Sequence, residues 1–265
     1  MPPLSNAQKA LVAQFVAITG TNDKVAQRFL KNANYRLDLA TNNYLNSGGA
    51  DTGRVASIEK AYDELVTSSN GDNKESLSAE TTQDYLESLG VNMENAELFV
   101  MMELVQAPGI GEITRQGFID GWKATDLTTF SKTAQKNYIR QKVAQLSTDP
   151  AYFRKVYRHA FIAGKEANQK ALPLENALVF WQLLFSPPGR PWKSANRDWA
   201  TLWETFLNDK WTRSVNKDMW NMTLEFANKS MDDETLGFYS EEDSWPAVID
   251  EFVSWYRQRD AMDIN

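Results

Sequence analysis

The chain contains no cysteine and a single histidine, His159. Without cysteine, a thiol nucleophile, a disulfide framework and a cysteine-ligated zinc site are all impossible. One histidine excludes metal sites built on paired histidines and gives little support to a Ser-His-Asp arrangement. No phosphate-binding glycine loop, dinucleotide fingerprint or zinc-protease motif occurs. The sequence therefore offers no catalytic set and no metal or cofactor site, and we expect His159 to be a packed or surface residue.

Long apolar runs and an excess of positive charge are missing as well. No stretch approaches the ~20 apolar residues of a membrane span, and the opening MPPLSNAQK lacks the apolar core of a signal peptide. The net charge of -7 and the pI near 5.0 argue against nucleic acid and anionic membranes as partners and favour a basic protein. We therefore expect a soluble protein of the nucleus and cytoplasm.

Helical periodicity dominates the chain, and strand-like alternation never extends beyond a few residues. The 9 Trp, 9 Tyr and 13 Phe supply a large core. The segment LNSGGADTGRV is rich in Gly, Ser and Asp, which is typical of a flexible linker. The predicted fold is all-α, with a three-helix module at 5–45, a flexible linker at 46–57 and a larger helical domain at 58–260.

The pattern FVAITGTNDKVAQRFLKNANYRLDLATNNYL (15–45) carries three short amphipathic helices. Gly20 ends the first helix, and Thr21-Asn22-Asp23 opens the second. The pattern resembles the ubiquitin-associated (UBA-like) module. This resemblance implies that the first loop and the end of the third helix contact ubiquitin or a ubiquitin-like modifier, through Ala17, Ile18, Thr19, Gly20, Tyr44 and Leu45. The alternative is a small docking bundle in which Ile18 and Tyr44 are core residues.

Two amphipathic helices near the C-terminal end flank an acidic loop. Helical spacing predicts that Asp218 lies on the solvent face of the first and Asp250 on that of the second. The predicted buried stripe of the first helix consists of Val215, Met219, Met222 and Phe226. That of the second consists of Trp245, Val248, Ile249, Phe252, Val253 and Tyr256. An acidic, solvent-facing surface on rigid helices indicates docking rather than catalysis.

Five segments, in this order, resemble the PONY domain of the defective-in-cullin-neddylation family. They are GEITRQGFIDGW (111–122), AYFRKVYRHAF (151–161), LPLENALVFWQLLF (172–185), KDMWN (217–221) and SWPAVIDEFV (244–253). The resemblance implies a scaffold-type ligase that promotes transfer of a Nedd/Rub-type modifier from its conjugating enzyme to a cullin lysine. It implies no covalent intermediate on the ligase, so the protein would not itself be an enzyme with catalytic residues.

The resemblance also implies two binding sites. An acidic patch would bind the basic winged-helix domain at the C-terminal end of the cullin, through Asp218, Ser244, Asp250 and Glu251; Ser244 stands where the family usually has Ala. An apolar pocket would take the acetylated N-terminal Met of the conjugating enzyme. The matching residues are Leu98, Met101, Ile110, Ile113, Ala163, Phe180 and Leu183, and Ala163 replaces a larger aromatic residue of many relatives.

The segments around Leu77 and Ile113 are similar to paired EF-hand loops, which predicts an EF-hand-like first half of the larger domain. The calcium-ligand positions would be Asn70, Asp72, Lys74 and Thr81 in one loop and Gln106, Pro108, Ile110 and Gly117 in the other. Calcium requires several carboxylates and a bidentate Glu at the last position, so we expect a scaffold without calcium. The sequence leaves a cullin-modifier ligase scaffold, a ubiquitin-binding adaptor acting through 5–45, and an unsupported hydrolase as functional hypotheses.

Overall fold

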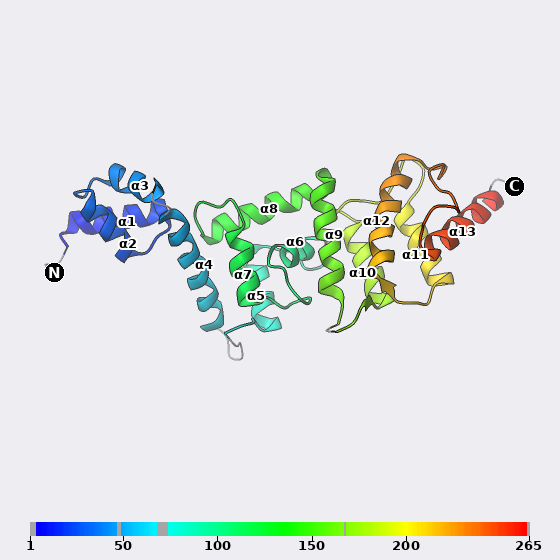
Figure 1. Ribbon diagram of the computed structural model, residues 1–265, viewed down its shortest axis with the longest axis horizontal. Coiled ribbons are helices and arrows are strands. Elements are labelled where there is room, and N and C mark those ends of the chain that lie inside the picture. Colours follow the sequence, from blue (N-terminus) through cyan, green and yellow to red (C-terminus); the bar gives the residue numbers. More distant parts are fainter. Residues whose placement is uncertain (1–3, 47–48, 68–73, 167, 264–265) are drawn as a thin grey trace. The chain divides into compact units, whose positions relative to one another are not determined.

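The computed structural model describes residues 4–46, 49–67, 74–166 and 168–263. Among these residues the regular structure is almost entirely helical (Figure 1), which confirms the predicted all-α class. The single sheet described there pairs β1 (Ala171–Leu172) with β2 (Val215–Asn216), antiparallel, with Leu172 opposite Val215. None of the described helices combines the length and the apolar character that crossing a membrane requires.

The N-terminal module consists of α1 (Asn6–Thr19), α2 (Asp23–Asn32) and α3 (Leu37–Asn46). Gly20 ends α1 in the left-handed conformation, at φ 68°, and the Asn22 side chain accepts a hydrogen bond from the first turn of α2. In the core, the Tyr44 ring stands edge-on to Phe15 and Phe29, with ring centroids 5.6 and 5.1 Å away. The predicted three-helix module is thus present.

Helix α4 (Gly49–Thr67) covers most of the segment predicted to be a flexible linker, so that prediction does not match the structure. Three carbonyl oxygens accept hydrogen bonds from the Arg54 guanidinium: those of Lys123 at 3.0 Å, Thr125 at 2.7 Å and Leu127 at 3.0 Å. A Cβ at Gly53 would overlap the Tyr44 hydroxyl oxygen. Gly53, one of the glycines that suggested a linker, therefore serves close packing against α3.

The EF-hand-like pairing predicted around Leu77 and Ile113 is present. The N–H of Leu77 donates to the Ile113 carbonyl at 3.0 Å, and the N–H of Arg115 donates to the Glu75 carbonyl at 2.8 Å. In sequence, the first loop lies between α4 and α5 (Ala79–Leu89), and the second lies between α6 (Glu97–Leu104) and α7 (Arg115–Lys123). Two of the compared calcium-ligand positions, Asn70 and Asp72, lie outside the described residues.

The chain forms two compact units. The first comprises Met1–Gly90, Leu104–Gln106 and Gly111–Arg140, and the second comprises Val91–Glu103, Ala107–Ile110 and Gln141–Asn265. Helix α8 (Lys132–Thr148) contributes to both. The second unit also holds α9 (Pro150–Gly164), α10 (Leu174–Leu184), α11 (Trp199–Lys210), α12 (Lys217–Asp232) and α13 (Ala247–Asp263).

A buried aromatic stack joins α9, α10 and α12. The Tyr157 ring lies 4.5 Å from Trp220, which in turn lies 5.1 Å from Trp181, between ring centroids. The Tyr157 hydroxyl donates to the Trp220 carbonyl at 2.8 Å, and the Trp220 indole N–H donates to the Tyr157 carbonyl at 2.9 Å. The Trp181 indole N–H donates to the Tyr157 hydroxyl at 2.8 Å. Every polar atom of this stack is satisfied, which fixes the three helices against one another.

The contacts of Arg54 predict a specific loss of stability. Arg54→Ala should lower the free energy of unfolding of the full chain by about 2 kcal/mol, because three carbonyls lose a charged donor. Urea unfolding measures this. Lys60→Ala on the same helix removes only an exposed pair with Glu64 and should change stability by about 0.5 kcal/mol or less. Equal losses in the two variants would contradict the assigned role of Arg54.

Candidate functional site

Asp218 is exposed in the first turn of α12, on the face that the sequence predicts. The Asn216 side chain caps the helix by accepting from the Met219 N–H at 2.8 Å. On the opposite face, Val215, Met219 and Phe226 are buried as predicted, whereas Met222 is only half-buried. A carboxylate near a helix N-terminus is favourable for the helix itself, and Asp218 combines that position with exposure to solvent.

Asp250 lies in the first turn of α13 and is half-buried rather than fully solvated. The Tyr239 hydroxyl donates to Asp250 Oδ1 at 2.8 Å. Burial and this bond to Asp250 raise the pKa of Tyr239 to about 12. Because the pKa of Tyr239 is raised on folding, its contribution to the stability of the fold is fully present below pH 10.0, the ordinary pKa of tyrosine. That contribution is lost as the pH rises through about 12. At neutral pH Tyr239 therefore remains a donor that holds the Asp250 carboxylate in one orientation.

Ser244 and Glu251 flank Asp250 and are both exposed. Glu251 Oε1 lies 3.5 Å from Arg213 Nη2, in an ion pair whose two members are largely solvated. Helices α12 and α13 pack through Phe226, whose ring centroid lies 5.6 Å from that of Phe252. The structure thus places Asp218, Asp250 and Glu251 near the starts of two helices that pack together, with Ser244 in the segment just before α13.

The acidic run between these helices divides into two groups. Asp233 accepts from the N–H groups of Thr235 at 3.0 Å and Gly237 at 2.8 Å, which closes the turn after α12. Glu234 takes hydrogen bonds from Ser194 and Asn196 that lower its pKa to about 2. These two carboxylates are engaged within the fold. Glu241, Glu242 and Asp243 are exposed directly before Ser244 and continue the negative surface, whereas Asp232 is exposed at the far end of α12.

The predicted apolar pocket residues come from α6, α9, α10 and the segment before α7, and they differ in exposure. Met101, Ile113 and Ala163 are buried, Leu98, Phe180 and Leu183 are half-buried, and Ile110 is 43% exposed. Ile113 belongs to the first unit. In the second unit, the Ile110 N–H donates to the Ala163 carbonyl at 3.0 Å. Met101 is a core residue, whereas Ile110, Phe180 and Leu183 offer apolar surface.

Phe180 is held in place by two contacts that the sequence did not reveal. Its ring stands edge-on to Phe99, with centroids 4.8 Å apart. A Cβ at Gly164 would overlap the Phe180 ring, so only glycine at the end of α9 permits this packing. The sequence pattern also did not predict that Val179 on α10 and Ile162 on α9 are exposed, by 50% and 45%. Both extend the exposed apolar surface of these helices.

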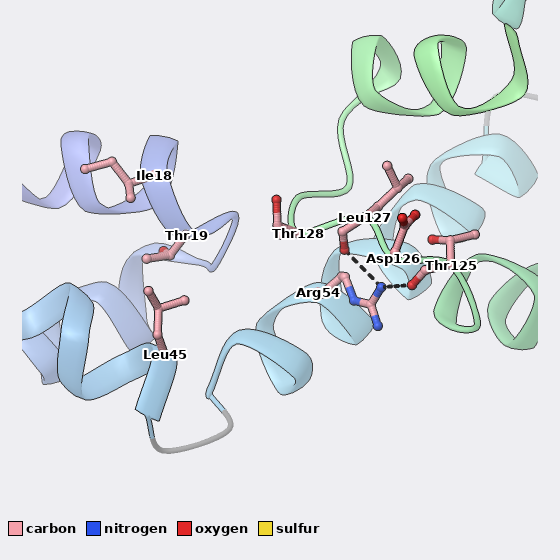
Figure 2. Close-up of a pocket in the computed structure, with 8 residues that line it drawn as sticks. All are labelled: Ile18, Thr19, Leu45, Arg54, Thr125, Asp126, Leu127 and Thr128. Carbon is pink, nitrogen blue, oxygen red and sulfur yellow. Dashed lines mark hydrogen bonds between the residues drawn. The ribbon is translucent and has the colours of Figure 1, made fainter. Parts of the chain in front are cut away.

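The N-terminal module presents an apolar surface of its own. Ile18 and Leu45 are 52% and 53% exposed, and both line a cavity of about 300 Å³ in the first unit. The other walls come from Thr19, Arg54 and residues 125–128 (Figure 2). The Gly20 carbonyl accepts a hydrogen bond from Ser57 Oγ at 2.7 Å. Exposure of Ile18 disagrees with the alternative in which it is a core residue.

Tyr44 is a correction to the predicted ubiquitin-contact set. Its side chain is 0% exposed and packs among Phe15 and Phe29. A residue enclosed by its own module cannot be a surface contact, and its aromatic character serves the small core instead. Thr19, a further predicted contact, is buried as well. Ala17, Ile18 and Leu45 are exposed, and of these Ile18 and Leu45 carry large apolar side chains.

Two family profiles match this chain. The Cullin binding family profile matches residues 134–255, and the UBA-like domain profile matches residues 9–51. "Defective in cullin neddylation protein 1" of Pyricularia oryzae is 47% identical, over 97% of this chain and 95% of the relative. The chain belongs to the defective in cullin neddylation family.

More distant members of the defective in cullin neddylation family match over shorter stretches. The protein of that name from Yarrowia lipolytica is 26% identical over 93% of this chain and 96% of its own. "DCN1-like protein 5" of Bos taurus is 27% identical over 71% of this chain and 74% of its own. The Cullin binding match contains all four acidic-patch residues together with Ala163, Phe180 and Leu183.

The packing of Phe180 predicts a sharp effect of one added methyl group. Gly164→Ala should lower the free energy of unfolding by about 1–3 kcal/mol, because the methyl group and the Phe180 ring cannot occupy the same space. Ring resonances of Phe180 should shift in NMR spectra. Ala151→Gly, at an exposed position of the same helix, should cost about 1 kcal/mol through helix propensity and leave those resonances unchanged. An undisturbed Phe180 in Gly164→Ala would contradict this packing.

Proposed function

We propose that this protein promotes cullin neddylation as a scaffold that binds two partners at once. The observation that carries the proposal is the Cullin binding match over residues 134–255, within a chain that resembles a defective in cullin neddylation protein along almost its whole length. The geometry supports docking rather than bond-making chemistry, because the residues at the candidate site are exposed carboxylates and apolar side chains.

The acidic surface suits a basic partner such as the cullin winged-helix domain. Asp218 is fully accessible, and Asp250 is oriented by Tyr239, so the surface requires little rearrangement before binding. Glu251 forms an exposed ion pair with Arg213, and a cationic side chain of the partner can replace Arg213 at low cost. Charge complementarity of this kind favours fast, oriented association.

The apolar surface of the second unit suits an uncharged N-terminus of the conjugating enzyme. Ile110, Phe180 and Leu183 are accessible, and none of the six candidate residues in this unit carries a carboxylate. An acetylated Met would bury without an unpaired charge, whereas a free ammonium group would lose its hydration with no partner. The same surface should therefore discriminate between the two forms of the enzyme.

Acceleration then follows from two simultaneous contacts. Holding the charged conjugating enzyme and the cullin on one scaffold raises their effective concentration and restricts the orientation of the acceptor lysine. In this scheme the acid–base groups belong to the partners, and the scaffold forms no covalent intermediate.

Charge reversal at Asp218 tests the cullin contact. Asp218→Lys should weaken binding of a cullin C-terminal fragment by ~2–4 kcal/mol, because like charges would face one another. Asp250→Lys should weaken binding by a similar amount and also release Tyr239, so Asp218 gives the cleaner result. Calorimetry with the purified fragment measures the affinity.

A matched control is Asp232→Lys, which makes the same charge change at the exposed far end of α12. It should leave cullin binding within a factor of about two, because screening limits the reach of a surface charge to about 10 Å. Equal losses of affinity in both variants would show that only the net charge of the protein matters. Unaltered binding by Asp218→Lys would contradict the assignment of Asp218 to the cullin contact.

The acetyl group tests the second contact. The acetylated N-terminal peptide of the conjugating enzyme should bind more tightly than the free-amine peptide by ~2 kcal/mol or more, roughly thirtyfold. Leu183→Ala should weaken the acetylated peptide and narrow that difference. Leu178→Ala is the control on the same helix, because Leu178 lines a different cavity with Trp181 and Trp203. Equal affinity of the two peptides would place the contact elsewhere.

A second candidate function concerns the N-terminal module. The UBA-like match and the exposed Ile18 and Leu45 support binding of ubiquitin or a ubiquitin-like modifier. Titration of the full chain with ubiquitin, with Ile18→Ala and Leu45→Ala as variants, distinguishes an adaptor from a scaffold that works without this contact. Full stimulation of neddylation by variants that no longer bind ubiquitin would favour the scaffold.

A further inference from the structure

Helix α9 is joined to the chain that precedes it by three polar contacts spaced four residues apart. Lys155 Nζ lies 2.8 Å from Glu103 Oε1, His159 Nε2 lies 3.0 Å from the Ala107 carbonyl oxygen, and the Ala163 carbonyl accepts from the Ile110 N–H at 3.0 Å. Lys155, His159 and Ala163 therefore follow one face of α9. All six residues belong to the second unit.

The central contact fixes the tautomer of His159. A carbonyl oxygen can only accept a hydrogen bond, so Nε2 must carry the proton. The side chain is 6% exposed, and burial lowers the pKa of His159 despite the Ala107 contact and the nearby Glu103 carboxylate. The ring is thus a neutral donor at physiological pH, and its acceptor is the backbone of another segment.

That segment, Ala107-Pro108-Gly109-Ile110, ends in one of the exposed apolar residues of the candidate pocket. Two of the three contacts hold its two ends: His159 at Ala107 and Ala163 at Ile110. Gly109 lies between them, and a glycine gives the backbone wide conformational freedom. The Ala107 N–H also donates to the Met102 carbonyl at 2.9 Å. Loss of the His159 contact would therefore loosen residues 108–110 without releasing Ala107 fully, and would let the Ile110 side chain move away from Ala163.

We propose that His159 is a positioning residue for the conjugating-enzyme pocket, holding the 107–110 segment so that Ile110 presents its side chain beside Ala163. This inference rests on the function proposed above. His159 touches neither partner; it acts through the backbone of Ala107. A histidine that merely fills the core would affect stability alone, whereas a positioning residue also controls peptide affinity. That affinity should depend on whether the side chain at position 159 places an N–H donor where Nε2 now lies.

Substitutions at His159 separate these roles in the full chain. His159→Ala removes the donor, His159→Gln places an amide N–H about as far from Cβ as Nε2, and His159→Asn places it one bond short. The acetylated N-terminal peptide of the conjugating enzyme should bind His159→Ala and His159→Asn about tenfold more weakly, through loss of one neutral hydrogen bond. His159→Gln should restore most of the affinity.

Hydrogen exchange of the Ile110 amide provides a second readout that needs no partner. Exchange should be faster in His159→Ala and His159→Asn than in wild type or His159→Gln, while amides of α12 stay protected. Unchanged Ile110 exchange in folded His159→Ala, or equal peptide affinity of the Gln and Asn variants, would overturn the proposal. If wild type and Leu183→Ala bind the peptide equally, the pocket itself fails, and changed Ile110 exchange then shows that His159 orders the segment for another purpose.

Discussion

The reciprocal contact between Tyr157 and Trp220 is the interaction on which the second unit depends. Each side chain donates to the backbone carbonyl of the other residue, and Trp181 donates to the Tyr157 hydroxyl. The rings are stacked as well, so a small shift of α9, α10 or α12 would break hydrogen bonds and ring packing together. Burial raises the pKa of Tyr157 well above its ordinary value, which keeps the hydroxyl a donor. The helices bearing His159, Phe180 and Asp218 are therefore fixed by one satisfied polar and aromatic centre.

This arrangement places two different surfaces on one rigid core. The carboxylates lie at the starts of α12 and α13, and the accessible apolar residues lie on α10 and beside the end of α9. Both surfaces are partly oriented before any partner binds, by Tyr239 for Asp250 and by Gly164 for Phe180. Preorganisation of this kind lowers the entropic cost of docking. A scaffold that relies on weak contacts benefits most from it, because each contact contributes little on its own.

The sequence predicted the features that depend on local pattern. Gly20 as the end of α1, the pairing of Leu77 with Ile113, and the exposed position of Asp218 all follow from capping residues or helical spacing. Predictions from the sequence were wrong where contacts between distant residues determine the role of a side chain. Gly53 suggested a linker, but the missing side chain accommodates Tyr44 inside a helix. Tyr44 resembled a contact residue, but a module of this size needs the ring in its core. The role of His159 could not be predicted, because its partner is a backbone carbonyl 52 residues away.

The dependence of cullin neddylation on the concentration of this protein tests the scaffold account most directly. In a purified system with limiting conjugating enzyme and cullin, the initial rate of modifier transfer should rise as the protein is added. It should then fall at high excess, because the two partners become bound to separate scaffold molecules. A rate that shows no stimulation at any concentration, or a modifier found covalently attached to this protein as an intermediate, would contradict the account.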